Sequence, residues 1–347
     1  MAFNSYSTSI RGASHDSSGK PCQDYSSCIT CEDYAVAVVS DGHGGSRYFR
    51  SEIGSKLAVQ AAVDVISSCM GAGRVDFITG IGQDPHGIMT RLSDAVLTRW
   101  TGLVQEYDTK NPHSEEERSL EGQDDDILRA YGATLICGVL SDDLAFGFQI
   151  GDGELVLVND ASSELMPIPE DPDCFLNRTS SICGSDASSR FRHFVISATV
   201  EGDESDNLRT IRADPRRISS ISVCTDGLST SFNSDESLMR YCMAIPEVLS
   251  SGGVRKLEEN LELRSRSNTC DDVSISVVYR PIRLGCSRVS TCKDAKSRAI
   301  RKKRKNIQKR KERRCGRRRY PRSTMSPLLT FADGVHPGRC IPQHAWE

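Results

Sequence analysis

Short apolar runs alternate with longer amphipathic stretches over the first 282 residues of the chain. Runs rich in β-branched residues predict strands, because such side chains pack well on a pleated, buried surface. The clearest is AVAVV at residues 35–39, which is free of charge and ends in SDGHGG. The predicted strands span residues 6–12, 34–40, 132–140, 144–150, 154–159, 192–199, 219–225 and 273–279.

Four stretches with apolar residues at helical spacing lie between these strands. In the first, Ile53, Leu57, Ala61 and Val65 recur every four residues, as on one face of a helix. The predicted helices span residues 51–70, 87–107, 234–249 and 253–267. The polar and acidic segment 108–126 predicts a solvated loop, and segment 160–190, rich in Ser, Pro and Asp, predicts an irregular connection.

The composition is that of a water-soluble globular protein. Of the 347 residues, 37% are apolar and 26% charged, and no apolar run approaches the roughly 20 residues that span a bilayer. The N-terminus has no apolar signal-peptide core, so we expect a cytoplasmic protein. The 14 cysteines are scattered, and Cys28-x-x-Cys31 has no second pair at zinc spacing. Buried, reduced thiols are therefore favoured over a zinc site.

The charges divide the chain in two. Residues 1–282 carry 24 Lys/Arg and 43 Asp/Glu, whereas residues 283–347 carry 20 and 4. Thirteen of the basic residues lie in residues 301–319, a composition that cannot build a packed core. We therefore expect a domain over 1–282 and a disordered tail over 283–347. The tail has several candidate contacts, namely nucleic acid, an anionic membrane surface, a nuclear-import receptor or the acidic body itself, and a solvated extension without a dedicated partner is the default.

Aspartates recur at the ends of the predicted strands. Asp41 follows VAVVS, Asp152 lies in GDGELVLV, Asp226 in TDGLS, Asp271 in CDDVSISVV and Asp24 in KPCQDYSS. Single Asp-Gly steps are common in hairpin turns, an alternative that applies most to Asp152. As a set, oxygen ligands without Cys or His pairs favour hard cations such as Mg²⁺ or Mn²⁺.

A pair of such cations suits hydrolysis at phosphorus. The two ions lower the pKa of a bridging water and screen the charge of the phosphoryl oxygens. His43 follows Asp41 by two positions, where it is a candidate to protonate the leaving oxygen. The alternative is a loop histidine that only bonds backbone.

Five ordered motifs make this interpretation specific. SDGHGG, YGATLICGVL, FQIGDGELVLV, SVCTDGLSTSF and CDDVSISVV resemble, in order and rough spacing, the PPM-type phosphatase 2C family of metal-dependent protein phosphatases. The opening GASHDSSGKPCQD is similar to its compact bacterial-type branch. The resemblance covers about residues 1–280. It implies an α+β fold in which two antiparallel sheets pack as a sandwich flanked by helices, and hydrolysis of phosphoserine and phosphothreonine in phosphoprotein substrates at a centre of two Mn²⁺ or Mg²⁺ ions with a bridging hydroxide.

The resemblance also implies a role for each motif residue. Asp41 would bridge the two ions, the Gly42 carbonyl would complete one coordination shell, and Asp226 and Asp271 would ligate the other ion. Asp24 and, more loosely, Asp152 would act through water or hold a weaker third ion. His43 would be the general acid.

The chain departs from the family pattern in two places. Gln23 stands where the family often has Glu; it adds no charge but can hydrogen-bond a metal-bound water. The family's upstream phosphate-binding Arg has no Arg counterpart, which leaves Lys20 and His15 as substitutes for binding substrate phosphate. Asp272 is expected to hydrogen-bond a neighbour rather than a metal. The alternatives to a protein phosphatase are a catalytically weak or inactive binding module of the same fold and a phosphatase of a small phosphoester.

Overall fold

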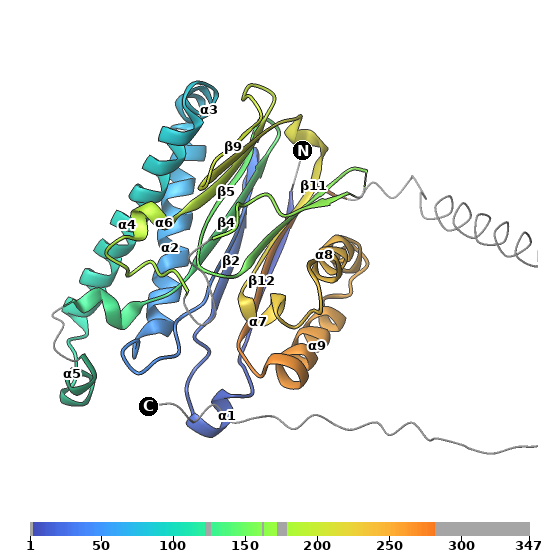
Figure 1. Ribbon diagram of the computed structural model, residues 1–347. Coiled ribbons are helices and arrows are strands. Elements are labelled where there is room, and N and C mark those ends of the chain that lie inside the picture. The colour runs from blue at the N-terminus through green and yellow to red at the C-terminus, as the bar shows by residue number, and fades with distance from the viewer. Residues whose placement is uncertain (1–2, 122–125, 162, 172–178, 282–347) are drawn as a thin grey trace, which may run out of the picture. The chain divides into compact units, whose positions relative to one another are not determined.

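Two β-sheets form the centre of the fold in the computed structural model (Figure 1). One has five strands in the order β1 (Asn4–Ile10), β12 (Val273–Tyr279), β11 (Ile218–Cys224), β6 (Glu154–Asn159) and β7 (Glu164–Leu165). The other has seven, in the order β2 (Tyr25–Thr30), β3 (Tyr34–Ser40), β4 (Leu135–Ser141), β5 (Ala145–Ile150), β8 (Arg192–Ser197), β10 (Leu208–Arg212) and β9 (Asp203–Glu204). Neighbouring strands are antiparallel except β8 and β10, which are parallel.

The structure describes residues 3–121, 126–161, 163–171 and 179–281. Residues Met1–Ile282 form one compact unit. The predicted basic tail, residues 283–347, lies outside the described residues, so its boundary and its contacts stay predictions. Within the described ranges, no helix combines the length and apolar character needed to cross a membrane.

The apolar run of β3 is continuous because both of its faces are covered. Ala35, Ala37 and Val39 belong to the core between the two sheets, whereas Val36 and Val38 belong to the core under the helices. All seven residues of this strand are buried. Alternating side chains of one strand therefore hold two layers of the sandwich together.

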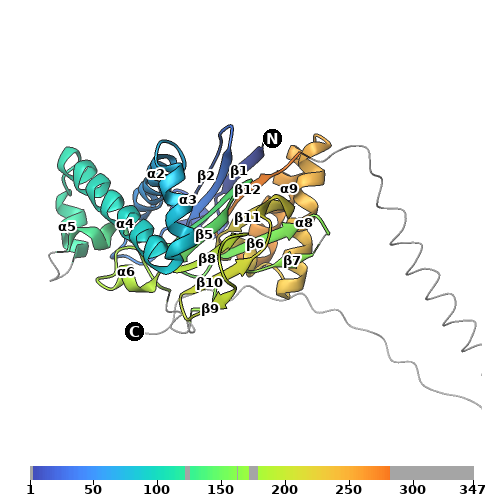
Figure 2. The ribbon, with the colours of Figure 1, turned by 90° about the horizontal axis from the view of Figure 1, so that it is seen from above.

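Helices cover the outer face of each sheet (Figures 1 and 2). α2 (Ser51–Met70), α3 (Arg74–Gln83) and α4 (Pro85–Lys110) lie against the seven-stranded sheet, and α8 (Asp235–Ser250) and α9 (Val254–Arg264) lie against the five-stranded sheet. The short helices are α1 (His15–Ser18), α5 (Glu115–Glu121), α6 (Ala187–Arg190) and α7 (Asp226–Ser229). Single 3₁₀ or π turns lie at Ile127–Tyr131, Pro215–Arg217 and Ser265–Thr269. This helix–sheet–sheet–helix order confirms the predicted fold class.

Each predicted strand and helix has a counterpart in the structure, and the main differences are as follows. The first strand runs from Asn4 to Ile10 rather than over 6–12, and the last helix ends at Arg264. Strands β2 and β10 and helix α3 were not predicted. The loop predicted over 108–126 is wrong, because α4 continues to Lys110 and α5 forms within this segment. The cysteines in the described ranges are all free, and Cys137, Cys224 and Cys242 are buried, as expected.

Candidate metal centre

The predicted aspartates converge at one end of the sandwich, where strands of both sheets begin or end. Asp41 directly follows β3, and Asp226 is the first residue of α7, after β11. These two carboxyl groups lie close enough to influence each other's pKa. Asp24 precedes β2 and Asp271 lies just before β12. Asp152 lies in the turn between β5 and β6, where its Oδ2 accepts a 2.6 Å hydrogen bond from Thr179 Oγ1.

Burial and mutual repulsion make these carboxyl groups hard to ionise. Burial raises the pKa of Asp41 well above its usual range, and the charges of Asp24, Asp226 and Asp271 raise it further. Burial, followed by the charges of Asp152 and Asp271, raises the pKa of Asp226 to about 6. The pKa values of Asp24 and Asp271 are also raised, in both cases mainly by burial. Each of the five side chains thus interacts electrostatically with at least one other member of the set.

The backbone around Asp41 is fixed by neighbouring strands. The Asp41 N–H donates to Thr134 Oγ1 at 3.0 Å, and the Thr134 N–H donates to the Asp41 carbonyl at 2.8 Å. Gly42 donates its N–H to the Gln23 carbonyl at 3.1 Å. A Cβ at Gly42 would lie 2.6 Å from the Ser51 carbonyl oxygen and 2.7 Å from that of Gln23, so only glycine fits this close approach.

His43 lies in the same loop. Its N–H donates to the Gly132 carbonyl at 3.1 Å, and its ring packs edge-on against Tyr48 with 4.8 Å between ring centroids. Burial lowers the pKa of His43, whereas the negative charge of Asp152 opposes this shift. The imidazole and Asp152 are therefore close enough to interact electrostatically.

Gln23 holds this loop in place through its side chain. Its Nε2 donates to the His43 carbonyl at 3.2 Å and to the Ser51 hydroxyl. The side chain is buried, only 7% exposed, between the loop and the start of α2. These bonds use the amide nitrogen, whereas a metal-bound water would donate to the amide oxygen, so the predicted hydrogen bond to such a water stays a prediction.

Asp272 accepts backbone hydrogen bonds from two segments near the centre. Its Oδ2 accepts the Gln23 N–H and its Oδ1 accepts the Gly12 N–H, both at 2.6 Å. The prediction that Asp272 hydrogen-bonds its neighbours is confirmed. These bonds tie the start of β12 to the segment before β2, and no sequence motif marks them, because the partners are backbone groups.

The two substitutes for the absent arginine lie nearby. Lys20 is exposed, and its Nζ donates to the Gly44 carbonyl at 3.0 Å, beside the His43 loop. His15 Nδ1 lies 2.9 Å from the Pro21 carbonyl and 3.5 Å from Asp272 Oδ1. Sequence reasoning missed Arg11, whose guanidinium binds the carbonyls of Lys20 and His15 and so shapes the segment that carries both candidates.

The donor set fits a hard divalent cation in its chemistry. It consists of carboxylates and the backbone carbonyl of Gly42, without a soft ligand. Among the described residues, however, no three His, Cys, Asp or Glu side chains already surround a common point as ligands do. A bound cation would stabilise the ionised forms of Asp41 and Asp226, whose pKa values are raised by burial and by the neighbouring carboxylates.

The fold and this cluster define an α+β sandwich protein with a carboxylate centre at the shared end of its sheets. A family model described as "Protein phosphatase 2C" matches residues 11–262. The chain therefore belongs to the protein phosphatase 2C family and is a protein serine/threonine phosphatase by class, as predicted.

Solved structures of bacterial phosphatases are similar to the chain at low identity. The Mycobacterium tuberculosis serine/threonine phosphatase PstP/Ppp is 16% identical, with a TM-score of 0.48, over 81% of this chain and all of its own. PstP in complex with two manganese ions is 17% identical, with a TM-score of 0.48, over 80% and 98%. PppA of Pseudomonas aeruginosa is 16% identical, with a TM-score of 0.46, over 80% and 98%. A search of curated protein sequences finds no match.

Proposed function

We propose that the protein hydrolyses phosphoserine and phosphothreonine in protein substrates at a centre of two Mn²⁺ or Mg²⁺ ions. The observation that carries the proposal is the set of buried carboxyl groups whose pKa values are raised by burial and by one another. Bringing several carboxylates together costs free energy, which bound divalent cations offset. When bound, such ions lower the pKa of water and stabilise the charge that develops on phosphoryl oxygens.

Each residue of the centre then has a separate task. Asp41 would supply its carboxylate to both cations, the Gly42 carbonyl would add a neutral ligand, and Asp226 and Asp271 would hold the second cation. Asp24 and Asp152 act through water or hold a third, weaker position. His43 donates a proton to the departing seryl or threonyl oxygen, and Lys20 and His15 contact the substrate phosphate. The cytoplasmic location is part of the same proposal.

The test compares hydrolysis of a phosphothreonine peptide with Mn²⁺ and with excess chelator. We expect turnover only with Mn²⁺, and we expect Asp41→Asn to lower kcat by about 10³-fold or more, as loss of a central catalytic group does. Calorimetric titration of Mn²⁺ into Asp41→Asn gives a second readout, since the variant should lose a tight site while keeping its far-UV circular dichroism. An inactive binding module of this fold would show no turnover in the wild type, and a small-molecule phosphatase would prefer p-nitrophenyl phosphate to every peptide.

A further inference from the structure

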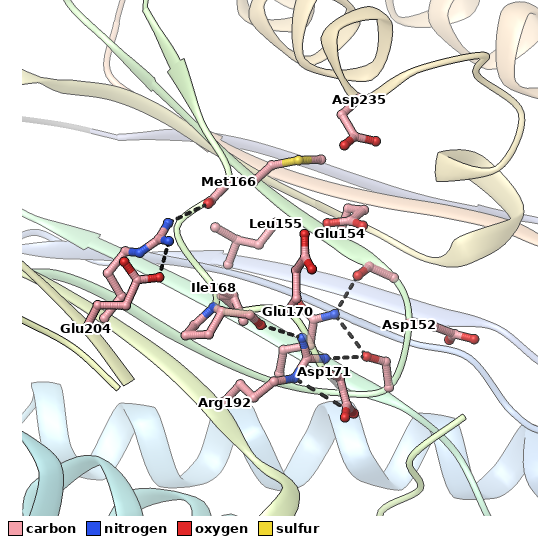
Figure 3. A pocket seen from close by; sticks show the side chains of 15 residues that line it. Asp152, Glu154, Leu155, Met166, Ile168, Glu170, Asp171, Arg192, Glu204 and Asp235 are labelled. Carbon is pink, nitrogen blue, oxygen red and sulfur yellow. Dashed lines mark hydrogen bonds and ion pairs between the residues drawn. The ribbon is translucent and has the colours of Figure 1, made fainter. Parts of the chain in front are cut away.

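A cavity of about 700 Å³ opens beside Asp152 (Figure 3). Its walls are the β5–β6 turn, the segment from Met166 to Asp171, the sheet edge formed by β8, β10 and β9, and the first residue of α8, Asp235. Because Asp152 lines it, the cavity adjoins the candidate metal centre. A substrate chain that reaches that centre can therefore extend into the cavity.

The charged side chains of this cavity are mostly acidic. Six of its lining residues are carboxylic acids, namely Asp152, Glu154, Glu170, Asp171, Glu204 and Asp235, against two arginines. Figure 3 shows Glu170 reaching toward Glu154 on one wall, with Asp235 facing them from the start of α8.

Both arginines are already used inside the protein. Arg192 is 8% exposed, and it donates to the carbonyls of Pro169 at 2.7 Å and Gly151 at 2.6 Å. Arg209 is paired with Glu204 and donates to the Met166 carbonyl at 3.3 Å. Arg192 Nε also lies 4.0 Å from Asp171 Oδ2. Within the described ranges, no ion pair joins a Lys or Arg to Glu154, Glu170 or Asp235. The cavity therefore keeps an excess of negative charge.

Part of the wall is apolar. Leu155, Met166 and Ile168 line the cavity next to the carboxylates. A lysine or arginine side chain has this same division, with an aliphatic stem that packs on apolar surface and a cationic head that pairs with carboxylates. A neutral side chain could pack on the apolar wall but would not pair with the carboxylates, and an acidic side chain would be repelled by them.

We propose that this cavity, lined by Glu154, Glu170 and Asp235 beside Leu155 and Met166, binds a lysine or arginine side chain of the phosphoprotein substrate close to its phosphorylated residue. The inference rests on the proposed phosphatase function and adds a substrate class to it, namely phosphosites with a basic neighbour. The carboxylates of the cavity act on recognition, whereas the aspartates of the metal centre act on hydrolysis.

The test uses phosphothreonine peptides of neutral sequence in which a single arginine is moved through the flanking positions, with a glutamine series for comparison. We expect kcat/KM for the best arginine peptide to exceed that of its glutamine counterpart by about fivefold, the size of one partly exposed ion pair. The advantage should shrink as salt is raised, because the wall carboxylates Glu170 and Asp235 are partly accessible to solvent.

The double variant Glu170→Gln/Asp235→Asn should lose the arginine advantage while hydrolysing the glutamine peptides and p-nitrophenyl phosphate at the wild-type rate. The matched control Glu247→Gln/Glu262→Gln, which removes the same charge from exposed positions on α8 and α9, should keep the advantage. The inference is overturned if the wild type hydrolyses arginine and glutamine peptides equally well, or if the double variant retains the preference. Failure of the proposed function is a different result, since then neither the arginine nor the glutamine phosphopeptides are hydrolysed appreciably.

Discussion

The side-chain amide of Gln23 offers the sharpest test of how the centre is held. It is buried and donates to the His43 carbonyl and the Ser51 hydroxyl, so it links the loop after β3 to the first turn of α2. In Gln23→Ala both hydrogen bonds disappear. The backbone bonds of residue 23, to Asp272 and from Gly42, do not depend on the side chain and should persist.

The size of the effect follows from the two bonds. A buried hydrogen bond contributes about 1 kcal/mol, and a partner left unsatisfied adds to the loss, so we expect Gln23→Ala to lower the free energy of unfolding by about 2 kcal/mol. For a domain of this size this corresponds to a fall in Tm of about 5 °C. The loop that loses these bonds carries His43 and Gly42. We therefore expect most of the lost free energy to appear as a higher activation barrier, which lowers kcat about tenfold.

Gln23→Glu separates two roles for this residue. If residue 23 served to hydrogen-bond a metal-bound water, a carboxylate would serve as well, and activity would be kept. In the structure, the side chain of residue 23 must donate an N–H to the His43 carbonyl. Glutamate has no such donor, and its negative charge would repel that carbonyl oxygen. We therefore expect Gln23→Glu to lose at least as much kcat as Gln23→Ala in Mn²⁺-dependent peptide hydrolysis. Wild-type kcat in Gln23→Glu would refute this reasoning, as would a Gln23→Ala variant that loses Tm but no kcat.

Two further predictions concern backbone space and pH. Gly42→Ala places a Cβ 2.6 Å from the Ser51 carbonyl oxygen, so it should reduce kcat and weaken Mn²⁺ binding, measured by calorimetry, more than tenfold. The control Gly102→Ala lies in open space on α4. It should leave kcat and Mn²⁺ binding unchanged and raise the free energy of unfolding by up to about 1 kcal/mol. Burial lowers the pKa of His193 from 6.5 to about 4 in the folded protein. As the pH falls, His193 therefore binds a proton in the unfolded protein at a higher pH than in the folded protein. Urea unfolding should show stability lost between about pH 6.5 and 4, by about 3 kcal/mol from this group, and the loss should be smaller in His193→Gln; an equal pH dependence would contradict the prediction.

The strands were predicted where their side chains are apolar and missed where hydroxyl groups replace them. β3 has apolar partners on both faces, which leaves a continuous run in the sequence. β2 instead meets the other sheet through serines, with Ser26 Oγ 2.9 Å from Ser9 Oγ and the Ser276 hydroxyl donating to the Ser27 carbonyl at 2.8 Å. Hydroxyl contacts of this kind leave no apolar alternation, so periodicity cannot identify the strand.

The loop predicted over 108–126 was wrong for a long-range reason. Its acidic run is typical of a solvated segment, but Arg50 reaches Glu117 with Nε at 2.8 Å and the Asn111 carbonyl with a terminal nitrogen at 2.6 Å. The guanidinium lowers the pKa of Glu117 to about 2. A partner 67 residues away in the sequence decides the structure here, and local composition carries no sign of it.

The candidate ligands were identifiable because aspartates at strand ends can be recognised in a sequence. The side chains that hold those aspartates in place cannot be recognised in the same way. Thr225 illustrates the difference: its hydroxyl donates to Asp24 Oδ2 at 2.7 Å and accepts the Ser274 N–H at 3.0 Å. One side chain thus joins the end of β11, the start of β12 and the segment that enters β2, and it fixes a carboxylate of one sheet against the edge of the other.

The packing that buries these acids also raises their pKa values, so the folded domain holds them together at an electrostatic cost. A divalent cation would offset that cost, and the nearby cationic side chains of Arg11 and Lys20 donate to backbone carbonyls. Metal binding should therefore stabilise the fold as well as supply the chemistry.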